Sequence, residues 1–128
     1  MIRFTILISI VLCFGQNVPP FDGKRAMDLL ITQCSFGPRF PESEGHTQMK
    51  KFMKEFLYPL ADSLYIMNEK ISHPYERRYI TLTNYLARFN LEADYRIMLM
   101  AHWDTREFAD QDPDPKNRSL PIIGANDG

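Results

Sequence analysis

The stretch that decides the fold is R-I-M-L-M-A-H-W-D, residues 96–104. It opens with an unbroken apolar run, Ile97 to Ala101, which is short enough to be a β-strand buried on both faces. The run ends in His102 and Asp104, so polar side chains stand at the carboxyl end of the predicted strand. Because α/β sheets usually bind their ligands at such strand ends, we expect the chemistry of the protein here.

Two amphipathic helices are predicted ahead of this strand. The first begins after the N-cap residue Asp22 and ends before Gly37. The second begins at Ser43 or Glu44 and ends at Leu60. Its stripe of methionine and phenylalanine is interpreted as core packing rather than as a ligand groove.

The hydrophobic period changes after the second helix. Residues 64–67 and 79–89 alternate β-branched or aromatic side chains with polar ones, which predicts an antiparallel hairpin of half-exposed strands. Followed by the buried strand at 97–101, this order predicts an α/β fold. In that fold, N-terminal helices precede the first strands of a mixed central sheet.

The N-terminus carries the features of a signal peptide over residues 1–15. Arg3 supplies a positive charge, residues 4–14 are apolar, and small side chains follow. Eleven residues are fewer than the roughly 20 that a membrane-spanning helix needs. We therefore predict a secreted or periplasmic protein. Attachment to a membrane is expected only through an uncleaved N-terminal anchor or a lipid on Cys13.

The charge and composition of the whole 128-residue chain limit its partners. Lys and Arg number 15 against 16 Asp and Glu, and no basic block is present, so nucleic acid is not an expected partner. A hydrophobic fraction of 45% is sufficient for the core of one domain.

His102 and Asp104 lie two residues apart, so a strand would project both from one face and Trp103 from the other. A carboxylate beside an imidazole fixes the tautomer of the ring, as acids do for metal-ligating histidines. Asp127 stands in a glycine-framed turn, 124–128, where the backbone can approach closely. These side chains predict part of a zinc site. The same His-x-Asp spacing also suits a purely structural hydrogen bond.

Other polar motifs are interpreted as structural. The acidic loop 110–114 imitates the first half of a calcium-binding loop, but Pro115 and Pro121 stand where the turn glycine and the bidentate glutamate are required. We therefore expect a solvated loop. His46 and His73 are interpreted as surface or capping histidines.

Several motifs in order resemble the zinc aminopeptidase and glutaminyl cyclase family, and most closely its secreted glutaminyl-peptide cyclotransferases. These motifs are F-G-P-R-F-P-E-S-E-G-H (36–46), T-N-Y-L-A-R-F (83–89), A-H-W-D-T-R (101–106) and P-I-I-G-A-N-D-G (121–128). The resemblance implies that residues 16–128 are the N-terminal part of a zinc-exopeptidase-like α/β/α sandwich.

The resemblance also implies roles for individual residues. Asp127 matches a zinc ligand, and His102 matches the histidine that binds a second zinc in two-zinc members only. Asp104 matches the acid that orients this histidine. The catalytic glutamate of the family is expected downstream of Gly128, so the sequence assigns no catalytic residue within the chain.

The activity that the resemblance implies is cyclisation of N-terminal glutamine in peptides or proteins, with release of ammonia. Zinc polarises the side-chain amide carbonyl, and a glutamate carries a proton from the α-amino group to ammonia. Two alternatives stay open. One is a zinc aminopeptidase of the same fold, and the other is a non-catalytic binding ectodomain.

A catalytic zinc site requires about three protein ligands, and this chain offers one or two. We therefore expect the 128 residues alone to bind zinc weakly and to show no activity. Titration of the purified chain with zinc checks this expectation, and micromolar or tighter binding would contradict it.

Overall fold

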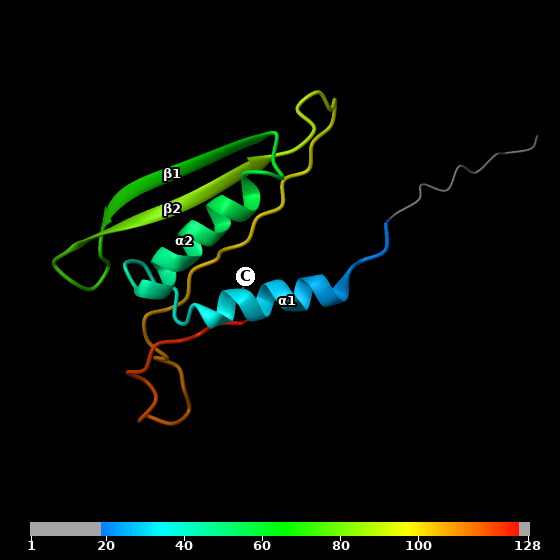
Figure 1. Cartoon of the computed structure of the whole chain (residues 1–128). Helices are drawn as coiled ribbons and strands as arrows, with labels where there is room; N and C mark the ends of the chain where they lie inside the picture. Colours follow the sequence, from blue (N-terminus) through cyan, green and yellow to red (C-terminus); the bar gives the residue numbers. More distant parts are fainter. Residues whose placement is uncertain (1–18, 126–128) are drawn as a thin grey trace, which may run out of the picture.

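The computed structural model describes residues 19–125, so the predicted signal peptide and Asp127 lie outside the described residues. The elements in chain order are α1 (Gly23–Ser35), α2 (Glu44–Leu57), β1 (Ser63–Ser72) and β2 (Tyr79–Arg88) (Figure 1). Helices followed by strands confirm the predicted α/β class. Within 19–125, no helix is long and apolar enough to cross a membrane.

Both helices begin at side-chain caps. The Asp22 carboxylate accepts a hydrogen bond from the backbone N–H of Arg25 at 2.9 Å, and Ser43 Oγ accepts one from the N–H of His46 at 3.1 Å. Each cap satisfies an amide that has no partner within its helix. The predicted starts are therefore confirmed. The second helix ends at Leu57, three residues before its predicted end.

The loop before α2 packs so closely on the helix that only glycine fits at position 45. A Cβ atom there would lie 2.3 Å from the carbonyl oxygen of Pro38 and 2.5 Å from that of Phe36. Both neighbours are backbone atoms, so a larger residue would displace the loop itself. Gly45 therefore allows the close approach that places this loop against the helix.

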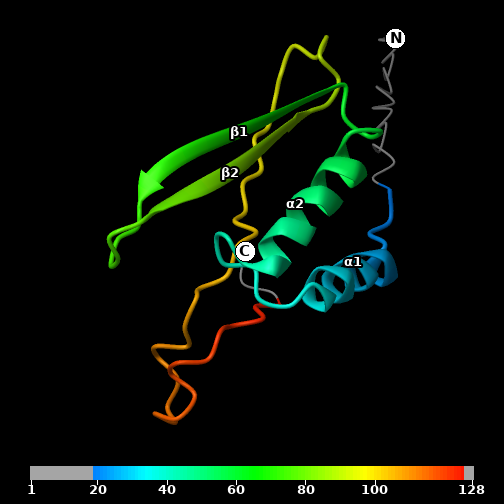
Figure 2. The same cartoon turned by 60° about the vertical axis from the view of Figure 1, so that its left-hand side comes forward.

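The two strands form the predicted hairpin. They pair antiparallel over their whole length, from Ser63 opposite Arg88 to Ser72 opposite Tyr79. In both views α2 lies between the hairpin and α1 (Figures 1 and 2). A hydrogen bond from the Tyr85 hydroxyl to the carbonyl oxygen of Lys50, at 2.9 Å, joins the hairpin to α2.

The predicted buried strand at 97–101 is wrong in this structure. The segment runs back from the end of β2 towards the hairpin turn as a single extended chain (Figure 1). Ile97 and Leu99 are 91% and 90% exposed. A β-strand forms when its backbone N–H and C=O groups bond to those of a neighbouring strand. Among residues 19–125, β2 pairs only with β1, so residues 97–101 have no strand partner. Hydrophobicity indicated burial, but no described layer covers this segment.

Arg39 ties the extended segments to the helices. Its side chain is buried, with only 3% of the residue exposed. Its guanidinium donates to five carbonyl oxygens, one through Nε, three through Nη1 and one through Nη2, so the two N–H groups of Nη1 are shared among three acceptors. The acceptors, at 2.6–3.4 Å, are the carbonyl oxygens of Gln33, Gly37, Trp103, Ile123 and Gly124.

Thr105 strengthens the same junction. Its hydroxyl accepts a hydrogen bond from the N–H of Arg39 at 2.8 Å, and its own N–H donates to the Arg39 carbonyl at 3.4 Å. Gly124 packs on Thr105 with a positive φ of 56°, and a Cβ atom on this glycine would lie 2.7 Å from Thr105 Cγ2. Residues far apart in the sequence therefore meet at one backbone junction.

Replacing Arg39 should loosen this junction. Arg39→Met keeps the apolar stem but leaves five carbonyl oxygens without their donor, so we expect a loss of roughly 3 kcal/mol in the free energy of unfolding. The loss should be seen as faster amide hydrogen exchange at Thr105. Arg77→Met, in the exposed hairpin turn, is the matched control and should change neither quantity. Unchanged exchange in Arg39→Met would contradict the assigned role.

Candidate functional site

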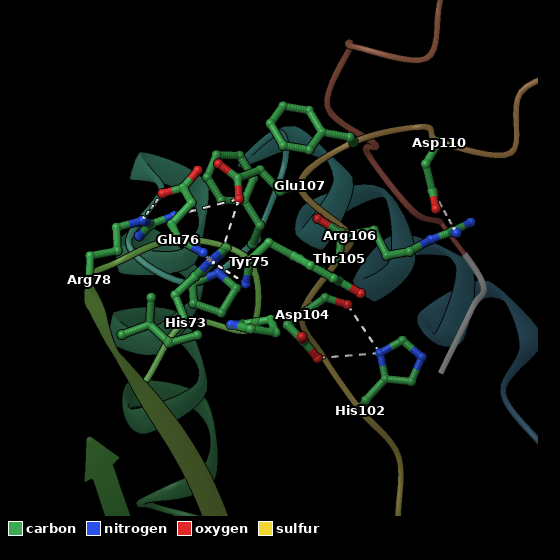
Figure 3. A pocket seen from close by; sticks show the side chains of 15 residues that line it. His73, Tyr75, Glu76, Arg78, His102, Asp104, Thr105, Arg106, Glu107 and Asp110 are labelled. Atoms are coloured by element: carbon green, nitrogen blue, oxygen red, sulfur yellow. Dashed lines mark hydrogen bonds and ion pairs between the residues drawn. The ribbon is translucent and has the colours of Figure 1, made fainter. Parts of the chain in front are cut away.

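His102 and Asp104 lie together at the end of the extended segment, as the sequence predicts. The Nδ1 atom of His102 is 3.4 Å from Oδ1 of Asp104 and 3.1 Å from the Asp104 carbonyl oxygen (Figure 3). Both side chains are about half exposed. With Nδ1 engaged by Asp104, Nε2 is the ring nitrogen that a metal ion would take.

Trp103, between these two residues, anchors the segment. Its indole N–H donates to the carbonyl oxygen of Thr83 in β2 at 3.1 Å. The ring stacks on His46 with centroids 4.6 Å apart and meets Tyr85 edge-on at 6.2 Å. The indole is therefore packed against β2 and α2, whereas the side chains of His102 and Asp104 are about half exposed.

His46 is buried, with 4% of the residue exposed, so its interpretation as a surface or capping histidine is wrong. Burial lowers its pKa from the ordinary 6.5, and Lys50 adds to this effect, whereas Asp104 and Glu42 oppose it. One signal in the sequence pointed to burial. His46 lies three residues before Met49, on the apolar stripe of the second helix.

A cleft of about 490 Å³ opens beside His102 and Asp104. It lies between the hairpin turn and the loop that follows Asp104 (Figure 3). Phe40, Ile80 and Phe108 give it apolar walls. Its volume and its mixture of apolar walls with a few polar groups are typical of small-ligand sites.

His73 and Glu107 form a second polar group in the cleft. Nδ1 of His73 accepts hydrogen bonds from the N–H groups of Tyr75 and Glu76, at 3.3 and 3.0 Å, so this histidine caps the hairpin turn as predicted. Its Nε2 lies 3.7 Å from Oε2 of Glu107. No sequence motif indicated this pair, because the contact requires the later loop to return to the hairpin turn.

Arg78 is the cation at the centre of this group. Its guanidinium contacts Glu76 at 2.5 Å, Glu42 at 2.6 Å and Glu107 at 3.5 Å. The hydrogen bond to Glu76 raises the pKa of Arg78, and the same bond lowers the pKa of the Glu76 carboxyl. Arg78 and Glu76 therefore both remain charged across the neutral pH range.

The donor set fits part of a zinc site. His102 and Asp104 have the chemistry of a ligand and the acid that orients it. In the described part of the chain, no three histidine, cysteine or acidic side chains converge closely enough to hold a metal ion. Asp127, the other predicted ligand, lies outside the described residues, so both ligand assignments stay predictions.

The acidic loop that follows the cleft has the solvated character that we predicted. Its residues are mostly exposed. Oδ1 of Asp112 accepts hydrogen bonds from the N–H of Asp114 at 2.8 Å and from Nδ2 of Asn117 at 3.3 Å. This carboxylate oxygen therefore stabilises the turns of the loop itself.

Comparison with solved structures reveals close likenesses, although no protein-family model and no curated protein matches the sequence. A glutaminyl cyclase from Bacteroides thetaiotaomicron, crystallised with N-acetylhistamine, is 35% identical over 88% of this chain, with a TM-score of 0.80. A leucine aminopeptidase precursor from the same organism gives the same values. A Zn-dependent exopeptidase from Parabacteroides distasonis is 31% identical over 87% of the chain, with a TM-score of 0.79.

These likenesses confirm the resemblance that the motifs predicted. The chain is similar in fold and in sequence to glutaminyl cyclases and to zinc-dependent exopeptidases. It spans 38% of the length of each of these three structures.

The buried His46 predicts a dependence of stability on pH. Because its pKa is lowered on folding from 6.5, the unfolded chain binds the proton more readily. The contribution of neutral His46 to the free energy of unfolding is therefore fully present above pH 6.5 and is lost as the pH falls below this value. We expect a lower urea midpoint at about pH 5 than at about pH 7.5, measured by the fluorescence of Trp103.

The control for this measurement is His46→Phe, which keeps a ring against Trp103 but cannot titrate. This variant should lose most of the difference between the two midpoints. An equal midpoint at both pH values in the unmodified chain would refute the assignment.

Proposed function

We propose that this chain is part of a secreted, zinc-dependent glutaminyl cyclase. The observation that carries the proposal is the His102–Asp104 pair facing a cleft, in a chain that is 35% identical to a solved glutaminyl cyclase. The proposed substrates are peptides or proteins that begin with glutamine. The proposed zinc ligands are Asp127 and, in a two-zinc site, His102.

The residues of the chain position the reacting groups in this proposal. Asp104 holds the His102 ring through Nδ1. Arg39 fixes the Trp103 carbonyl and, through Ile123 and Gly124, the backbone just ahead of Asp127 in the sequence. Zinc, when bound, would polarise the carbonyl group that is attacked.

The proposed reaction closes a ring within the substrate. The α-amino nitrogen of the N-terminal glutamine forms a bond to the side-chain amide carbon, and the bond from that carbon to its amide nitrogen breaks. The proton that the α-amino group loses leaves with ammonia. Asp104 and Glu107, both in the cleft wall, favour the approach of a positively charged peptide terminus.

A zinc aminopeptidase is the second candidate. It is supported by the likeness to a leucine aminopeptidase precursor at the same 35% identity. The same cleft would then hold an N-terminal residue while water attacks the following peptide bond. A binding module without catalysis is less well supported, because the contact between His102 and Asp104 has the form that metal sites use.

The test uses the protein expressed from the complete reading frame that encodes this chain. We expect ammonia release from glutaminyl peptides and no release of leucine from leucyl peptides. Asp104→Asn should lower zinc affinity or activity by about 10–100-fold. Asp94→Asn, an exposed acid in a loop, is the control and should change neither.

Each alternative has its own signature in this assay. Leucine release without ammonia release would replace the proposal by an aminopeptidase. Zinc binding without either product would favour the binding module.

A further inference from the structure

We propose that the cleft beside His102 selects peptides with a positively charged side chain shortly after the N-terminal residue, and that Glu107 determines this specificity. The inference rests on the proposed function in one respect, namely that the cleft receives the N-terminal segment of a peptide. It goes further by naming the class of peptide and the residue that recognises it.

The first argument is the fixed position of the Glu107 carboxylate in the cleft wall. It is held by two residues of the hairpin turn, by Nε2 of His73 at 3.7 Å and by Arg78 at 3.5 Å. The neighbouring His73 is itself fixed, because its Nδ1 accepts two backbone N–H groups of the turn. Glu107 is 28% exposed, so it faces the cleft from a partly desolvated position.

The second argument is the charge of the surrounding group. Glu42, Glu76 and Glu107 share the single guanidinium of Arg78, which leaves two negative charges uncompensated. The other cation of the cleft, Arg106, is paired with Asp110 at 2.7 Å.

The third argument is that the cleft is more than a group of acids. Phe40, Ile80 and Phe108 line it with apolar surface beside the carboxylates. Lysine and arginine combine an apolar stem with a charged head, and such side chains place the stem on apolar surface and the head near an acid. An acidic peptide side chain would be repelled by the excess negative charge, and a neutral one would leave that excess uncompensated.

The experiment compares three peptides on the protein from the complete reading frame. They are Gln-Lys-Ala amide, Gln-norleucine-Ala amide and Gln-Glu-Ala amide, and norleucine matches the lysine stem without its charge. We expect kcat/KM for the lysine peptide to exceed that for the norleucine peptide by about five- to tenfold, with the glutamate peptide lowest. The ratio should shrink as salt is added.

Two variants assign the preference to Glu107. In Glu107→Gln the ratio of lysine to norleucine peptide should fall to about one, since the amide keeps the shape and loses the charge. Glu69→Gln, an exposed acid of β1, is the matched control and should keep the ratio. A wild-type ratio of one, or a ratio that persists in Glu107→Gln, would overturn the inference.

Failure of the proposed function is distinguishable from failure of this inference. If no peptide releases ammonia, the cyclase proposal fails, and calorimetric binding of the same three peptides then decides the inference. Tighter binding of the lysine peptide, weakened by salt, supports it. Equal binding of the lysine and norleucine peptides contradicts it, and this comparison needs no variant to fold.

Discussion

The interaction between the Arg39 guanidinium and five backbone carbonyl oxygens connects the parts of this structure. Large buried hydrophobic residues are few in the described chain, with Met49 and Ile80 as the core. Directional hydrogen bonds therefore hold the loops where apolar packing does not. Arginine suits this role because its planar fork carries five donors and its charge strengthens each hydrogen bond. The acceptors lie in three segments that are far apart in the sequence, at 33–37, 103 and 123–124.

The candidate site depends on this junction. The backbone of Trp103 is held by Arg39, and its ring is held by the carbonyl of Thr83 and by the stack on His46. Because both the backbone and the ring of Trp103 are held, the neighbouring residues His102 and Asp104 have defined positions. Both of their side chains line the cleft. An exposed segment without strand pairing can therefore still offer a defined pair of functional groups.

The cleft combines two polar groups with different tasks. The imidazole and carboxylate at the end of the extended segment have the chemistry of a metal ligand and its orienting acid. The carboxylates around Arg78 carry an excess of negative charge that suits recognition rather than proton transfer. This division agrees with the likeness to glutaminyl cyclases and zinc-dependent exopeptidases, and it separates the proposed chemistry from the proposed choice of peptide.

Local signals in the sequence determined the caps of both helices, the hairpin and the pairing of His102 with Asp104, because these features depend on neighbours a few residues apart. The motifs also indicated the family likeness. Only the tertiary structure decided the exposure of residues 97–101, the burial of His46 and the contact of Glu107 with Arg78. Each of these features depends on which segment, distant in the sequence, packs against the residue in the folded chain. Hydrophobicity and residue type describe what a side chain favours, whereas burial and charge pairing are decided by the layers and loops that reach it.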